Sequence, residues 1–227
     1  MSSSERIIQL RRLLSEKFPG ARFSAERAAD SIPVWPTAIS QIDDLLRGGL
    51  PKGGIVEVVK EPNSGSALFI SALLRKAAKE NQIITLIDGQ DSFDPCALEQ
   101  EDLWRLLWVR CKNALEAMKA VDLILRDRNL PLVLLDLALN PAKQLRKIPS
   151  STWYRLQRIV ETTSTIFVVI TPQAMIGCAE ARLRFNGRFA LEDLDAEQFQ
   201  LLEKLKVDLT QHRLHLSEIR EEKAEAG

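Results

Sequence analysis

Cysteine and histidine are scarce in this sequence, and their scarcity argues against a disulfide framework and a metal site. The 227 residues include three cysteines, Cys96, Cys111 and Cys178, which lie far apart and form no CxxC motif. An odd number of cysteines in a chain of this length argues against a disulfide framework and fits a reducing cytoplasm. The two histidines, His212 and His215, would face opposite sides of a strand and have no third ligand nearby in sequence, so we expect no metal site.

Net charge and long apolar segments are also missing. Lysine and arginine number 31, as do aspartate and glutamate, so no net charge draws the chain toward nucleic acid or a membrane, although local patches can still do so. Arginines interrupt the apolar residues of the N-terminal stretch MSSSERIIQLRRLL, so we expect neither a signal peptide nor a membrane span there. The remaining composition, 45% apolar and 27% charged, is ordinary for a soluble globular protein with one large core.

Apolar segments that alternate with amphipathic ones predict the fold class. Continuous apolar runs, typical of strands covered on both faces, occupy 54–59, 83–87, 132–135 and 165–170, with a further short strand expected at 106–109. Helical patterns lie between them at 66–80, 114–128 and 151–162. We therefore predict an α/β protein with a doubly wound, mainly parallel sheet flanked by helices. Alternation of apolar and polar residues at 181–185 and 204–210 indicates antiparallel edge strands near the C-terminus.

The same patterns divide the chain into three regions. Residues 1–36 are expected to form an N-terminal arm, residues 37–216 the core domain, and the polar residues 217–227 a fraying tail. Trp104 and Trp108 lie at helical spacing within the core domain, and we expect both side chains to fill the core.

The arm combines an amphipathic helix with a linker. Apolar residues fall at helical spacing over 4–18, and Pro19-Gly20 ends the helix. Ile7, Leu10 and Leu14 form its apolar stripe. This stripe either docks a partner or a second copy of the chain, or packs on the domain of its own chain.

The segment that follows the first apolar strand has the position of a phosphate-binding loop but not its residues. In the pattern G-x-x-x-x-G-K-[ST], backbone N–H groups wrap the phosphates, the lysine neutralises them, and the hydroxyl holds magnesium. Here Lys60 replaces the first glycine, Gly65 keeps the second, and Ser66 and Ala67 replace the lysine and the hydroxyl. Loss of one charge-assisted contact costs about 1.5–3 kcal/mol, so we expect no bound nucleotide or other cofactor. The alternatives are a turn that only builds the fold and a helix N-terminus that holds a lone anion weakly.

Four stretches resemble, in the correct order, segments of RecA-type recombinases. They are TAISQIDDLLRGGLPKGGIVEVV, IDGQDSFDP, PLVLLD and RLQRIVETTSTIFVVI. The resemblance implies a RecA-like fold, and it places Gln90 at the catalytic glutamate and Asp136 at the magnesium-linked Walker B aspartate. An amide cannot be the base that activates water, so the resemblance also implies a protein that is not an enzyme. Thr171-Pro172 replaces the family's asparagine-glutamine pair, and only MIGCAE stands where a long DNA-binding loop is expected.

Within that superfamily the sequence resembles the ImuA-like, or SulA-related, group. The length, the altered loop and the stretch LLWVRCKNALEAMKAVDLIL before LVLLDL carry this resemblance. Such proteins are accessory factors of bacterial damage-induced mutagenesis, and they act with an inactive Y-family polymerase homologue and an error-prone replicative-type polymerase. The resemblance implies a cytoplasmic, non-catalytic protein that binds these polymerases or a RecA-type recombinase in translesion synthesis, and it leaves self-association open.

A basic stretch with aromatic residues follows the Walker B position. No acidic residue occurs from 141 to 158, and Trp153 and Tyr154 lie within the stretch. Its candidate nucleic-acid contacts are Lys143, Arg146, Lys147, Arg155 and Arg158. Cations beside aromatic rings are typical of single-strand binding. The alternative is a solvated helix face with Trp153 in the core, which the zero net charge and the missing DNA loop favour.

Three functions follow from these features. The first is a non-enzymatic interaction protein, because the lysine, the magnesium hydroxyl and the catalytic glutamate are lost together. The second is a switch that binds ATP without hydrolysing it, which Gly65 and Asp136 motivate. The third is a single-stranded DNA-binding repair factor, which the basic stretch motivates.

Overall fold

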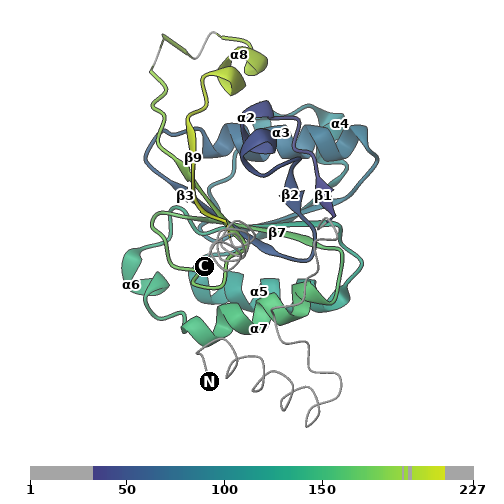
Figure 1. Cartoon of the computed structure of the whole chain (residues 1–227), viewed down its shortest axis with the longest axis vertical. Helices are drawn as coiled ribbons and strands as arrows, with labels where there is room; N and C mark the ends of the chain where they lie inside the picture. The colour runs from purple at the N-terminus through teal and green to yellow at the C-terminus, as the bar shows by residue number, and fades with distance from the viewer. Residues whose placement is uncertain (1–32, 191, 194–195, 213–227) are drawn as a thin grey trace, which may run out of the picture. The chain divides into compact units, whose positions relative to one another are not determined.

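A seven-stranded sheet forms the centre of the structure, a computed structural model that describes residues 33–190, 192–193 and 196–212 (Figure 1). The strand order is β5-β4-β6-β7-β3-β8-β9. The strands are β3 (Ile55–Lys60), β4 (Ile84–Asp88), β5 (Leu106–Arg110), β6 (Leu132–Asp136), β7 (Ile166–Thr171), β8 (Ala181–Phe185) and β9 (Val207–His212). Strands β3 to β8 pair in parallel, and β9 runs antiparallel to β8. The predicted α/β fold with a mainly parallel sheet is confirmed.

The predicted antiparallel pair near the C-terminus is also confirmed, but only β9 lies at an edge of the sheet. β8 pairs in parallel with β3, and Ala181 lies opposite Val56. This direction arises because the loop after β7 returns the chain to the edge where β3 begins. β9 starts at Val207, later than predicted, because α8 (Gln198–Glu203) precedes it and Leu205 is buried.

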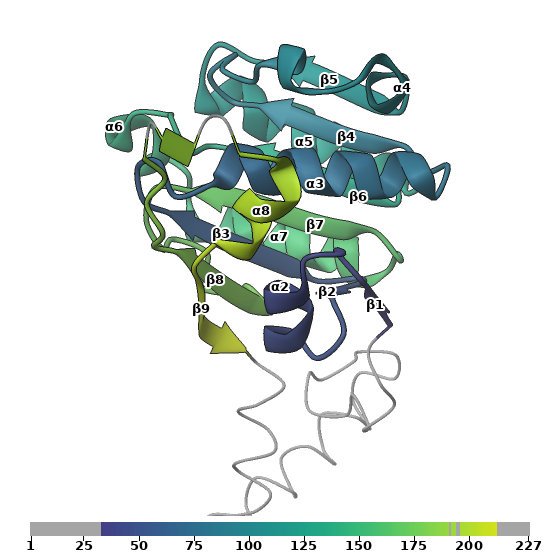
Figure 2. The ribbon, with the colours of Figure 1, turned by 90° about the horizontal axis from the view of Figure 1, so that it is seen from above.

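Helices cover both faces of the sheet (Figures 1 and 2). One face carries α2 (Ser40–Leu45), α3 (Ser66–Lys79), α4 (Gln100–Leu103) and α8, and the other carries α5 (Ala114–Asp127) and α7 (Ser150–Glu161), which α6 (Ala142–Leu145) precedes. The remaining elements are η1 (Pro95–Ala97) and an antiparallel pair, β1 (Val34–Trp35) with β2 (Leu50–Pro51). α4, α6 and α8 were not predicted, because helices of less than two turns show no recognisable apolar period.

Two apolar cores, one on each face of the sheet, hold these layers together. In β6, Leu134 packs in the core beneath α3, whereas Val133 and Leu135 pack in the core beneath α5 and α7. Both faces of a central strand are therefore apolar, which explains the continuous apolar runs in the sequence.

The tryptophans divide between core and surface. Trp153 lies on the buried side of α7, in agreement with the alternative that placed it in the core. The prediction for Trp104 was wrong: its side chain is 77% exposed. Trp104 follows the short α4, whereas Trp108 lies on β5, so the two do not share a helix. Trp108 is partly buried and packs edge-to-face on Phe93, with 5.5 Å between ring centroids.

The predicted arm and tail fall largely outside the described residues. Val34 and Trp35, which belong to the predicted arm of residues 1–36, pair with β2 as strand β1. Within the described residues, no helix has the length and apolar character needed to cross a membrane. In the same part of the chain, no three His, Cys, Asp or Glu side chains gather where they could hold a metal ion.

Candidate functional site at the carboxyl edge of the sheet

The parallel strands bring the predicted nucleotide-site residues to one edge of the sheet, which we call the carboxyl edge. These residues are Lys60, Gly65, Ser66, Ala67, Gln90 and Asp136. Lys60 ends β3, Gly65 precedes α3, Gln90 follows β4 and Asp136 ends β6. In open α/β sheets this is the edge at which ligands bind.

The loop between β3 and α3 turns through two left-handed residues. Asn63 has φ 56° and Gly65 has φ 92°, a conformation that glycine adopts without strain and asparagine tolerates. The Ser64 hydroxyl donates to the carbonyl of Glu61 over 2.7 Å, which closes the turn. α3 then begins at Ser66, so a short hydroxyl side chain and no ammonium group stands at the start of the helix.

Residues from the C-terminal part of the chain pack directly on this loop. A methyl group added at Gly65 would lie 2.7 Å from both Leu205 Cδ1 and Phe189 Cε2. The backbone N–H of Phe189 donates to the carbonyl of Asn63 over 3.2 Å, and Leu205 is buried. Sequence reasoning missed both side chains, because more than 120 residues separate them from the loop and no motif marks them.

Asp136 has an electrostatic environment that favours its neutral form. Burial, and secondly the neighbouring carboxylate of Asp88, raise the pKa of the Asp136 carboxyl from 3.8 to about 6. The backbone N–H of Ala138, 2.9 Å from Asp136 Oδ1, and the ammonium group of Lys60 oppose this rise in pKa. The pairing of β4 with β6 places Asp88 directly opposite Asp136.

Gln90 is held by hydrogen bonds that link the segments after β4 and β6. The Asn140 side-chain amide donates to Gln90 Oε1 over 3.3 Å and to the carbonyl of Gly89 over 2.8 Å. The backbone N–H of Gly89 donates to the Asp136 carbonyl over 2.8 Å. An amide at position 90 serves this network, but it cannot accept the proton of an attacking water molecule.

The buried carboxylate of Glu57, on β3, binds the segment after β7 through hydrogen bonds and an ion pair. Glu57 Oε1 accepts from the backbone N–H groups of Met175 and Ile176, at 2.8 and 3.2 Å. Glu57 Oε2 forms an ion pair with Arg182 Nε at 2.6 Å. Thr171, which ends β7, donates its hydroxyl to Glu57 Oε1 over 3.2 Å. The segment from 172 to 180 is therefore fixed to the core.

The structure separates the five basic candidates into two groups. Lys143, Arg146 and Lys147 are exposed on and just after α6. Arg155 and Arg158 project from the exposed side of α7, where Tyr154 is 51% exposed. The arm residues Ile7, Leu10 and Leu14 lie outside the described residues.

Comparisons with known proteins connect the chain to RecA. No protein-family model matches it. It is 29% identical to Protein RecA of Streptomyces rimosus over 114 residues, which are 49% of this chain and 30% of that protein. It is 26% identical to Protein RecA of Francisella philomiragia over 129 residues, which are 55% of this chain and 36% of that protein. The chain thus matches about a third of the length of these relatives. The comparisons support distant homology to RecA over about half of the chain. The protein is therefore RecA-like.

Proposed function

We propose that this chain is a non-catalytic RecA-like accessory protein that binds other proteins in a bacterial damage-induced mutagenesis complex. The observation that carries the proposal is the start of α3, which has Ser66 and Ala67 where ATP binding requires a lysine and a magnesium-binding hydroxyl. The same loop is packed against Phe189 and Leu205, so its glycine serves internal packing.

The other catalytic positions support the same conclusion. Gln90 is bound to Asn140 and has no carboxylate with which to activate water. Asp136 is retained, and an aspartate at the end of a strand does not by itself indicate hydrolysis.

The proposed partners follow from the resemblance to ImuA-like proteins. They are a RecA-type recombinase, a mutagenic polymerase or an inactive Y-family polymerase homologue, in the cytoplasm of a bacterium. We propose that the RecA-like core has lost hydrolysis and kept surfaces that bind these proteins in translesion synthesis.

A sensitive ATPase assay tests the loss of catalysis. We expect the full chain and its Asp136→Ala variant to give the same background release of phosphate. Turnover by the unmodified chain that Asp136→Ala abolishes would contradict the proposal, because it would show a working magnesium-dependent site.

Co-purification tests the partner role. We expect the full chain to co-purify with at least one of the three proposed partners, and a chain without residues 1–20 to bind it less. If no partner co-purifies, the accessory role is wrong. If truncation changes nothing, the arm is not the docking element.

A second candidate function is a nucleotide-sensing switch, favoured by the joint presence of Gly65 and Asp136 at the carboxyl edge. Isothermal calorimetry with ATP and magnesium distinguishes the two functions. Saturable heat would support the switch, and the absence of heat near millimolar ATP would eliminate it.

A further inference from the structure

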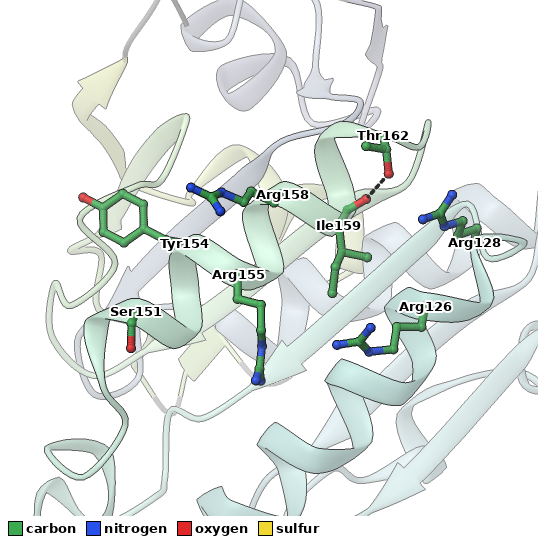
Figure 3. Close-up of a pocket in the computed structure, with 8 residues that line it drawn as sticks. All are labelled: Arg126, Arg128, Ser151, Tyr154, Arg155, Arg158, Ile159 and Thr162. Atoms are coloured by element: carbon green, nitrogen blue, oxygen red, sulfur yellow. Dashed lines mark hydrogen bonds between the residues drawn. The ribbon is translucent and has the colours of Figure 1, made fainter. Parts of the chain in front are cut away.

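Arginines from two helices meet in an open groove on the face of the molecule that carries α5 and α7. The groove has a volume of about 500 Å³ and lies along the exposed side of α7, beside the end of α5 (Figure 3). The lining residues that matter here are Arg126, Arg128, Tyr154, Arg155, Arg158 and Ile159. We call it the α5–α7 groove.

Two of the arginines already hold a carboxylate between the helices. Asp122 of α5 accepts from Arg126 Nε over 2.9 Å and forms an ion pair with Arg155 of α7 at 3.2 Å. Both arginine side chains remain 56% exposed, so this pairing leaves guanidinium donors open to solvent. Arg126 and Arg155 therefore already bind one carboxylate and keep further guanidinium N–H groups exposed.

The other two arginines are open. Arg128 follows the last turn of α5, and Arg158 lies one turn beyond Tyr154 on α7. Among the described residues neither side chain has a hydrogen-bond or ion-pair partner. No carboxylate lines the groove, although Asp127 and Glu161 lie close by in sequence. Four arginines thus line a groove in which Ile159 supplies an apolar surface, with Arg158 on the side of Tyr154 and Arg128 at the end of α5 (Figure 3).

We propose that the α5–α7 groove binds a short acidic segment of a partner protein, in which carboxylates alternate with apolar side chains. Carboxylates of the segment would pair with Arg128 and Arg158, and an apolar side chain would lie on Ile159. From Ser151 to Thr162 the groove follows α7 for about 16 Å at 1.5 Å per residue. That length matches about five residues of an extended peptide at roughly 3.3 Å each.

Two observations favour a peptide over nucleic acid. The chain carries no net charge, so it lacks the long-range field that attracts a polyanion. Asp122 also lies between two of the arginines, where it would repel a continuous phosphate backbone but leaves the outer two arginines free for separate carboxylates.

Fluorescence anisotropy with the full chain tests this inference. The probe is a fluorescein-labelled peptide of glutamate and aspartate with interspersed leucines, and the same peptide with amides in place of the acids is the negative control. We expect Arg128→Glu combined with Arg158→Glu to weaken binding by about tenfold or more, since tenfold equals about 1.4 kcal/mol and charge-assisted hydrogen bonds are of that order. Lys143→Glu combined with Lys147→Glu changes the charge equally outside the groove, and it should leave binding unchanged.

Several outcomes would overturn the inference. They are no binding of the acidic peptide by the full chain, equal loss in both double variants, or displacement of the peptide by oligothymidylate at similar or lower concentration, which would indicate a nucleic-acid surface. If the groove variant does not fold, the single Arg158→Glu variant decides, because Arg158 is exposed and without a partner among the described residues.

The inference rests on the proposed role as a protein-binding scaffold. Peptide binding can fail while the ATPase assay still shows background only, so the two failures are distinguishable.

Discussion

Glu57 and Glu61 show how burial changes the contribution of a glutamate–arginine ion pair to stability. Glu57 lies on β3 and Glu61 directly follows it, and each pairs with an arginine of β8, Glu57 with Arg182 and Glu61 with Arg184. The Glu57 side chain is fully buried and makes three further hydrogen bonds, whereas the Glu61 pair is exposed. Removing one partner of a buried pair leaves the other charge without compensation, but an exposed pair is replaced by water.

We therefore predict different costs for two matched variants. Glu57→Gln should lower the free energy of unfolding by about 3 kcal/mol, because Arg182 would lose its carboxylate. Glu61→Gln should lower it by less than about 1 kcal/mol. Urea unfolding of both variants measures the difference. Equal costs would show that the buried network does not fasten the segment after β7.

Asp136 provides a prediction of pH dependence. Its pKa is raised from 3.8 to about 6 in the folded protein, so folding favours the protonated carboxyl. The resulting stabilisation is present below pH 3.8 and is lost as the pH rises through 6. Asp136→Asn should therefore raise the free energy of unfolding by about 1–3 kcal/mol at pH 8, and the gain should disappear toward acid pH. Urea unfolding across this range measures it, with the exposed Asp127→Asn as control. A gain that does not change with pH would refute the assignment.

At the scale of elements, the β3–α3 unit keeps the shape of a phosphate-binding turn without its chemistry. Its glycine is required by a left-handed φ and by the close packing of Phe189 and Leu205. Whether the unit binds phosphate therefore depends on the side chains at the start of α3, and this dependence is open to test.

We predict that Ser66→Lys combined with Ala67→Thr increases ATP binding without restoring hydrolysis. A lysine contact to phosphate contributes about 1.5–3 kcal/mol, which corresponds to roughly ten- to a hundredfold in affinity. Hydrolysis should stay at background because Gln90 cannot activate water. Calorimetry and phosphate release measure the two effects separately. The single Ala67→Thr variant, which adds no cation, is the control. Turnover by the double variant would show that the base lies elsewhere.

For the whole molecule, one sheet separates two cores that cannot form independently. Strand residues alternate between the core beneath α3 and the core beneath α5 and α7, so loss of either core leaves one face of the central strands without its packing. Cooperative unfolding of the folded domain follows from this sharing.

Matched truncations on the two faces test this cooperativity. Leu73→Ala lies in the first core and Leu156→Ala in the second, and both side chains are fully buried. Each should lower the free energy of unfolding by about 2–5 kcal/mol, with circular dichroism and tryptophan fluorescence following one coincident transition. Separate transitions for the two variants would mean that each face unfolds on its own.

The sequence by itself determined the α/β class, the central strands and the long helices. These features depend on apolar period and on residues adjacent in the chain, and a strand covered on both faces has a continuous apolar run wherever it lies in the sheet. The sequence also ended two of these strands at Asp88 and Asp136, and carboxyl ends of parallel strands share one edge of the sheet.

Only the tertiary structure decided which distant segments meet. Phe189 and Leu205 cover Gly65, and Arg126 and Arg128 join Arg155 and Arg158 in one groove, although no motif connects either set. The same holds for β8, whose direction depends on the path of the loop after β7. These contacts arise from the strand order and from helices folding back over the sheet, and a local pattern carries no information about either.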